Sequence, residues 1–100
     1  MIQPQLNMAE PTQIQKDTVT VYVGNPEKVL FEGEAVAVSS KNEKGPFDVL
    51  LQHENFICTV QEKVIIHLKG GGKKEIPISK GILKVEVNSI NIFLGIEGIR

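Results

Sequence analysis

The sequence has no tryptophan, only five aromatic residues and a single cysteine among its 100 residues. With so few rings, valine, isoleucine and leucine must fill the interior. One cysteine, Cys58, excludes an intrachain disulfide, which favours a reducing compartment. Because Cys58 follows Phe56 and Ile57 in a short apolar run, we expect a buried and unreactive thiol rather than a nucleophile.

An excess of positive charge is also missing. Eleven Lys and Arg residues face twelve Asp and Glu residues, for a net charge of −1. A nucleic-acid binder needs a concentrated basic surface, so the sequence predicts no nucleic-acid partner. Three lysines, Lys69, Lys73 and Lys74, surround a triple glycine, which is typical of a solvated turn. This segment lacks the Ser or Thr and the following helix that a phosphate-binding loop requires.

Long apolar runs and catalytic motifs are absent as well. No run approaches the roughly 20 residues of a membrane-spanning helix, and the N-terminus lacks the basic and apolar pattern of a secretory signal. The two histidines, His53 and His67, do not share zinc-ligand spacing with Cys58, and no nucleophile and base pair is recognisable. We therefore expect no catalytic residue, no metal and no cofactor, and membrane association only through a partner.

Short apolar runs with a period of two are present instead. Between residues 18 and 23, Val19, Val21 and Val23 alternate with Thr18, Thr20 and Tyr22, which predicts a half-buried strand. Similar runs are bounded by turn residues, and no stretch has a helical period. Strands are predicted at 18–23, 29–31, 35–38, 47–51, 56–60, 64–68, 74–78, 82–87 and 90–94, with a loop at 41–46, turns at 62–63 and 88–89, a break at 79–81 and a glycine hairpin at 70–72.

This pattern predicts one domain, an all-β antiparallel sandwich of about nine to ten short strands over residues 18–100. Residues 1–17 are polar and show no period, so they are predicted to form a flexible tail. Met8 within the tail is an alternative start. A chain trimmed to begin near Asp17 should keep the melting temperature of the full chain.

The alternation separates two faces in the second half of the chain. The predicted core face consists of Val64, Ile66, Leu68, Leu83, Val85, Val87, Ile90, Ile92 and Leu94. On the opposite face Ile65, Ile82 and Phe93 are apolar where water would be expected. An apolar patch of this kind often marks a partner surface. The alternative is that the sandwich itself covers these three side chains.

Three segments carry a resemblance to a known family. Residues 31–35 (FEGEA) look like its Phe-x-Gly-x-Ala step. Residues 45–53 (GPFDVLLQH) are similar to its Gly-x-Phe-Gly-Val-Leu-Pro-Gly-His stretch, and residues 78–85 (ISKGILKV) resemble its Ser-Gly-Gly-Phe-Leu-Glu-Val segment. In order and spacing, residues 19–97 resemble the N-terminal β-sandwich of the epsilon subunit of the F-type ATP synthase.

The resemblance implies a non-catalytic central-stalk (rotor) subunit that joins the gamma subunit to the c-subunit ring of a proton-translocating synthase. Such a subunit is peripheral, at the cytoplasmic face of a bacterial or organellar membrane. We expect Ile65, Ile82 and Phe93 to form part of the gamma surface. The resemblance puts Pro46, Asp48 and His53 on a ring-facing loop, although Asp48 replaces a glycine of the family and residues 51–52 replace its Pro-Gly.

The family continues into a C-terminal two-helix hairpin that inhibits ATP hydrolysis and, in some members, binds ATP. Since the sequence ends at Arg100, we expect it to lack this switch and not to bind ATP. Two alternatives stay open at this point. One is a free-standing β-sandwich adaptor unrelated to the synthase, which would not bind gamma. The other is a small-ligand-binding β-barrel, which would have a closed sheet and an interior pocket.

Overall fold

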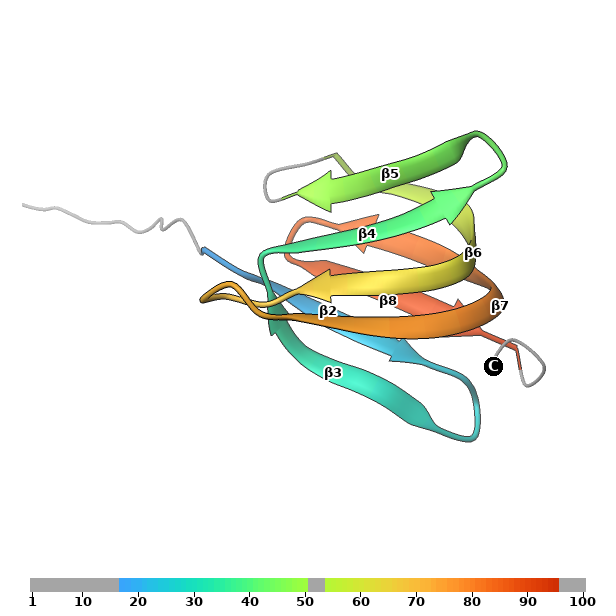
Figure 1. Ribbon diagram of the computed structural model, residues 1–100, viewed down its shortest axis with the longest axis horizontal. Helices are drawn as coiled ribbons and strands as arrows, with labels where there is room; N and C mark the ends of the chain where they lie inside the picture. The colour runs from blue at the N-terminus through green and yellow to red at the C-terminus, as the bar shows by residue number, and fades with distance from the viewer. Residues whose placement is uncertain (1–16, 51–53, 96–100) are drawn as a thin grey trace, which may run out of the picture.

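The computed structural model describes residues 17–50 and 54–95. Within these residues seven strands form one sheet in the order β3-β2-β8-β7-β6-β4-β5 (Figure 1). The strands are β2 (Val19–Gly24), β3 (Val29–Ala35), β4 (Ala37–Asn42), β5 (Gly45–Leu50), β6 (Phe56–His67), β7 (Lys73–Glu86) and β8 (Ser89–Leu94). Every pairing is antiparallel except that of β2 with β8, which is parallel. The all-β prediction is confirmed, and no helix among these residues is long and apolar enough to cross a membrane.

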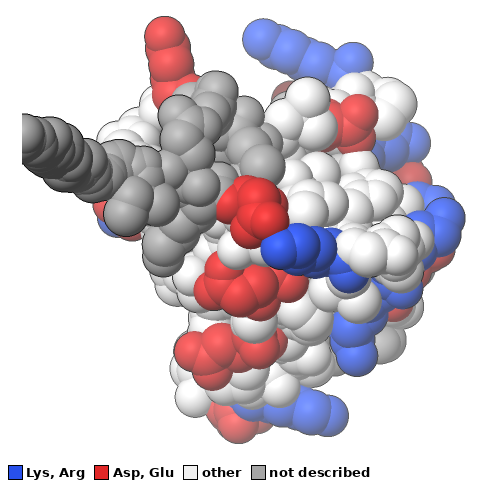
Figure 2. Space-filling view, turned by 90° about the vertical axis from the view of Figure 1, so that its left-hand side faces the viewer, with Lys and Arg blue, Asp and Glu red and all other residues white. Residues whose placement is uncertain are grey.

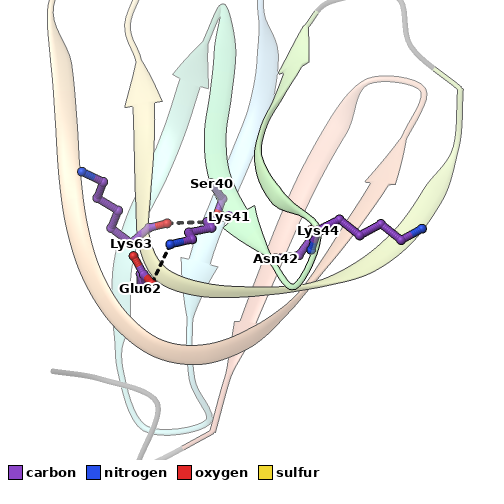
Figure 3. A network of polar contacts seen from close by, with 6 residues as sticks. All are labelled: Ser40, Lys41, Asn42, Lys44, Glu62 and Lys63. Atoms are coloured by element: carbon purple, nitrogen blue, oxygen red, sulfur yellow. Dashed lines mark hydrogen bonds and ion pairs between the residues drawn. The ribbon is translucent and has the colours of Figure 1, made fainter.

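The single sheet makes a sandwich because its two longest strands, β6 and β7, bend in the middle and run from one layer into the other (Figures 1 and 3). The first layer holds β3, β2 and β8, with residues 81–86 of β7 and 56–61 of β6. The second layer holds residues 73–77 of β7 and 63–67 of β6, with β4 and β5. Side chains from both layers pack into one buried cluster.

The bend in β6 lies at Glu62, whose φ of 72° is in the left-handed region, and the pairing with β7 shifts register between Gln61 and Lys63. Across this shift Glu62 faces two residues of β7, 78 and 79, so the extra residue lies in β7. An extra residue in one strand of a pair bends the strand and increases its twist. The turn predicted at 62–63 is therefore wrong, because the chain bends there inside a continuous strand. The break predicted at 79–81 also lies inside a strand, β7. Counting each half of β6 and β7 separately accounts for most of the difference from the predicted strand number.

Next to the bend, Lys63 of β6 pairs with Pro77 of β7. In this half of β7 no strand among residues 17–50 and 54–95 pairs with the other edge, since β8 pairs only with residues 81–86. A proline in that position costs no ladder hydrogen bond. The structure thus offers Pro77 an unpaired edge, and the orientation of its nitrogen toward that edge stays a prediction.

Two predicted connections differ from the structure. The loop predicted at 41–46 is a tight hairpin, since Asn42 pairs with Gly45 and the chain turns at residues 43–44. Gly45 has a φ of 120°, a conformation that only glycine adopts readily, and this lets β5 start at once. The turn predicted at 88–89 lies at 87–88, because Glu86 already pairs with Ser89. Val87 is consequently 69% exposed rather than part of the core. The hairpin predicted at 70–72 is confirmed.

The core contains most of the apolar side chains that alternation assigned to it. The buried residues are Val19, Val21, Val23, Ala35, Val38, Val49, Val60, Val64, Ile66, Ile76, Ile78, Leu83, Val85, Ile90, Ile92 and Leu94. Leu68 is partly buried and packs against them. Within the described part of the chain, β3 and β5 end the sheet without pairing to each other, and side chains fill its interior. The small-ligand barrel is therefore wrong.

Candidate partner-binding surfaces

The outer face of the first layer carries a line of apolar side chains across four strands, three of them exposed and one partly buried. Ile82 of β7 and Phe93 of β8 are register partners and are 50% and 49% exposed. Ile57 of β6, 66% exposed, lies diagonally beside Ile82. The ring of Tyr22 on β2 lies 6.2 Å from that of Phe93, centroid to centroid, at an angle of 45°. We refer to Tyr22, Ile57, Ile82 and Phe93 as the outer strip.

The outer strip depends on a glycine. Gly24 pairs with Phe93 across β2 and β8. A Cβ atom at Gly24 would lie 2.6 Å from Tyr22 Oη and 2.8 Å from the carbonyl oxygen of Lys28. Only glycine therefore leaves room for the Tyr22 ring in its observed position. A hollow of about 250 Å³ begins beside these rings, lined by Tyr22, Gly24, Asn25, Pro26, Phe93 and Leu94.

Sequence reasoning found two members of the outer strip and missed the other two. The alternation in residues 18–23 places Tyr22 among the polar positions of its strand, although its ring adds apolar surface there. Ile57 was placed in a short apolar run without a face. For Tyr22 the signal is the alternation itself. Tyr22 lies between the buried Val21 and Val23, so its side chain faces away from the core.

The third predicted member, Ile65, does not lie in the outer strip. Its register partners are Ser39 of β4 and Glu75 of β7, which belong to the second layer. Ile65 is partly buried, and it points away from the core like Ile82, but the bend at Glu62 separates the two. The three residues therefore do not form one surface, because alternation along a strand cannot report that the strand changes layers.

The structure brings Ile65 together with two of the residues assigned to the ring-facing loop. Pro46 and Asp48 lie on the edge strand β5 and not in a loop, and His53 lies outside the described residues. A hollow of about 140 Å³ opens between β4, β5 and the bend of β6. We call it the β5 hollow, and it is lined by Ser39, Ser40, Lys41, Pro46, Phe47, Asp48, Glu62, Lys63 and Ile65.

A chain of hydrogen bonds crosses the three strands at the β5 hollow. Ser39 Oγ lies 2.5 Å from Asp48 Oδ1 and 2.8 Å from His67 Nε2. An ionised carboxylate only accepts, so the single hydroxyl proton of Ser39 goes to Asp48, and His67 Nε2 donates to Ser39. The chain joins β6, β4 and β5 and orients the carboxylate of Asp48.

The walls of the β5 hollow are fixed by further polar contacts, several of which Figure 3 shows. Lys41 Nζ lies 2.8 Å from Glu62 Oε2, and Ser40 Oγ donates to the carbonyl oxygen of Lys63 at 2.8 Å. Lys63 Nζ lies 3.3 Å from Glu75 Oε2. Exposed pairs contribute little to stability. The first two contacts join β4 to the bend of β6, and the third joins β6 to β7.

Charges of both signs lie side by side at the end of the molecule that Figure 2 shows, where acidic side chains form a column beside a group of basic ones. Asp17 and Lys69 join segments far apart in sequence, and their Oδ2 and Nζ atoms are 2.5 Å apart. The hydrogen bond and the charge of Lys69 lower the pKa of Asp17. Asp17, the last residue of the predicted flexible tail, is thus tied to the domain, and residues 1–16 lie outside the described residues.

In residues 17–50 and 54–95, no group of three or more His, Cys, Asp or Glu side chains is placed to hold a metal ion. Cys58 is partly buried against the core. Burial raises the pKa of its thiol, with an opposing contribution from a hydrogen bond of Asn42. A raised pKa is the opposite of what a nucleophilic thiolate requires.

Comparison with known families identifies the domain. Residues 18–95 match the sequence profile described as ATP synthase, Delta/Epsilon chain, beta-sandwich domain. The chain is 33% identical over 73 residues to the ATP synthase epsilon chain of a Nitratiruptor species, covering 72% of this chain and 57% of that one. It is 35% identical over 69 residues to the ATP synthase epsilon chain of Clostridium perfringens (strain 13), covering 68% and 52%. The chain thus spans a little over half the length of these relatives.

Solved structures show the same fold. The first is a chain from the Euglena gracilis mitochondrial ATP synthase (OSCP/F1/c-ring), with a TM-score of 0.73 and 16% identity over 83% of this chain and 54% of that one. A chain from the Tetrahymena thermophila mitochondrial ATP synthase (central stalk/c-ring) aligns with a TM-score of 0.64 and 12% identity, covering 80% and 65%. At these identities the likeness concerns the fold alone.

Proposed function

The chain belongs to the ATP synthase delta/epsilon family through its β-sandwich domain, and we propose that it acts as a non-catalytic central-stalk subunit of a proton-translocating F-type ATP synthase. In this role it would join the gamma subunit to the c-subunit ring. The epsilon chains that it resembles are subunits of an enzyme complex, which favours this role over that of a free-standing adaptor. The complex would hold the chain at the cytoplasmic face of a membrane through its partners.

The single observation that carries the proposal, beyond family membership, is the outer strip. Its side chains lie on one outer sheet face, where Ile57, Ile82 and Phe93 are half to two-thirds exposed and Tyr22 is partly buried beside them. Aromatic residues and exposed apolar patches are enriched at protein interfaces. We propose that Ile82 and Phe93, together with Tyr22 and Ile57, contact the gamma subunit.

The ring contact is proposed at the β5 side of the second layer. Pro46 and Asp48 lie there on the edge strand, and His53 follows β5 in sequence. Because Ile65 lines the same hollow as Pro46 and Asp48, we propose that it belongs to this second contact instead of the gamma surface. The two proposed contacts then lie on different layers, as a subunit joining two partners requires.

Binding to the isolated gamma subunit from the same source tests the proposal. We expect a complex with a single transition in titration calorimetry or interferometry, and competition by an authentic epsilon chain for the same site. Failure to bind gamma, with a folded domain, would favour the free-standing adaptor. Co-purification with the c-subunit ring after assembly with gamma tests the second contact separately.

A further inference from the structure

The β5 hollow has the size and walls of a site for one side chain. Its volume is about 140 Å³, and Ile65, Phe47 and Pro46 give it apolar walls. Pockets for small ligands and cofactors usually measure about 300–1,000 Å³. The hollow is therefore too small for a cofactor and suits a single side chain of a partner.

The charges around the hollow leave one group uncompensated. Lys41 pairs with Glu62 at 2.8 Å, and Lys63 pairs with Glu75 at 3.3 Å. Asp48, the remaining charged residue in the lining, forms no ion pair within residues 17–50 and 54–95. The complementary group on a partner is a cation.

The carboxylate of Asp48 is also held in place before any partner arrives. Ser39 donates to its Oδ1 atom, and His67 donates to Ser39 in turn. A partner that binds a carboxylate already oriented loses less conformational freedom than one that must order it. The hydrogen-bonded chain thus prepares Asp48 as an acceptor at the rim of an apolar hollow.

We propose that the β5 hollow docks an arginine side chain of a protein partner, with the aliphatic stem against Ile65 and Pro46 and the guanidinium on Asp48. Arginine fits this combination because it buries its stem, is weakly hydrated and binds carboxylates through paired N–H donors. The inference deepens the proposed function and rests on it for the assignment of β5 to a partner surface.

Nuclear magnetic resonance titration of the ¹⁵N-labelled chain with the peptide acetyl-Gly-Arg-Gly-amide tests the site. The control peptide carries citrulline, the neutral isostere of arginine. We expect saturable shifts of the Ser39, Asp48 and Ile65 amides with the arginine peptide, and binding about tenfold weaker with citrulline. Added salt should weaken only the arginine complex.

Two variants separate the charge from its positioning. Asp48→Asn should bring arginine binding to the citrulline level, and Ser39→Ala should reduce the preference for arginine, while the spectra stay those of a folded domain. Glu32→Gln, an exposed carboxylate on β3, should change nothing. Equal binding of both peptides, shifts that map elsewhere or no saturable shift would each overturn the inference. Because no synthase subunit takes part, such a result leaves the gamma-binding test of the proposed function intact.

Discussion

Ile82 on β7 and Phe93 on β8 are register partners that each leave about half of their surface exposed, although their chain neighbours Leu83 and Ile92 are fully buried. The sheet therefore has apolar side chains on both faces at this point. Only one face is covered by the described residues of the domain, so the other is free to bind a partner. The first prediction follows from this pair.

Phe93→Glu should weaken binding to the gamma subunit at least about tenfold, since one large apolar side chain contributes roughly 1.5–3 kcal/mol on burial. The melting temperature should change little, because the side chain is 49% exposed. Calorimetric titration with gamma and a thermal scan of the free domain measure the two effects. Val87→Glu, which adds the same charge in an exposed turn, is the matched control.

The same titration with Ile65→Glu tests how the two surfaces divide. Ile65 lies beyond the bend, so the affinity for gamma should stay at the level of the unchanged chain. Loss of the fold in Phe93→Glu would mean that the ring is needed by the core. A folded Phe93→Glu that binds gamma normally would remove the outer strip from the gamma surface.

Gly81→Ala should destabilise the domain by about 1–3 kcal/mol, the usual cost of overpacking. A Cβ atom there would lie 2.6 Å from Leu94 Cδ2 and 3.0 Å from the carbonyl oxygen of Phe93. Chemical denaturation gives the change in the free energy of unfolding. Gly72→Ala is the control, since its new methyl group would meet only Leu68 Cδ1 at 3.8 Å. Equal stability of the two variants would show that β7 and β8 move apart without strain.

Ser40→Ala should lower the free energy of unfolding by about 1–2 kcal/mol, because it leaves the carbonyl of Lys63 without its donor at the bend. For a domain of this size the melting temperature should fall by roughly 4–8 °C for each kcal/mol lost. Ser79→Ala removes an exposed hydroxyl from β7 and should leave the melting temperature unchanged. If both variants melt alike, the hydrogen bond of Ser40 does not hold the bend.

Cys58 should react with iodoacetamide several-fold more slowly in the folded chain than in urea at the same pH, roughly in proportion to its smaller thiolate fraction. Burial raises the pKa of the folded thiol, so the unfolded chain ionises first as the pH rises. The domain should accordingly lose stability above the ordinary pKa of a thiol, and Cys58→Ser should reduce that loss. Equal alkylation rates in both states would contradict the expected burial.

The sequence by itself determined the strand class and most of the inward faces. Alternation of valine and isoleucine identified Val21, Leu83 and Ile92 as core, because a period of two sends every second side chain to the same face. The glycine hairpin after Leu68 was equally clear, since positive φ angles are accessible to glycine without strain. Both are local properties, because they depend only on residues that are neighbours in the sequence.

Only the tertiary structure decided which outward residues meet. Ile65 and Ile82 both occupy outward positions of their strands, yet one lies beside Asp48 and the other beside Phe93. The difference arises at Glu62, a non-glycine residue whose left-handed conformation no pattern in the sequence predicts. Its bend is held by contacts with β4, a strand some twenty residues earlier in the chain. Local alternation determines whether a side chain points into or out of the sheet, but not which layer of the sandwich it lies on. Pairing between distant segments determines the layer, and so divides the exposed residues between two surfaces.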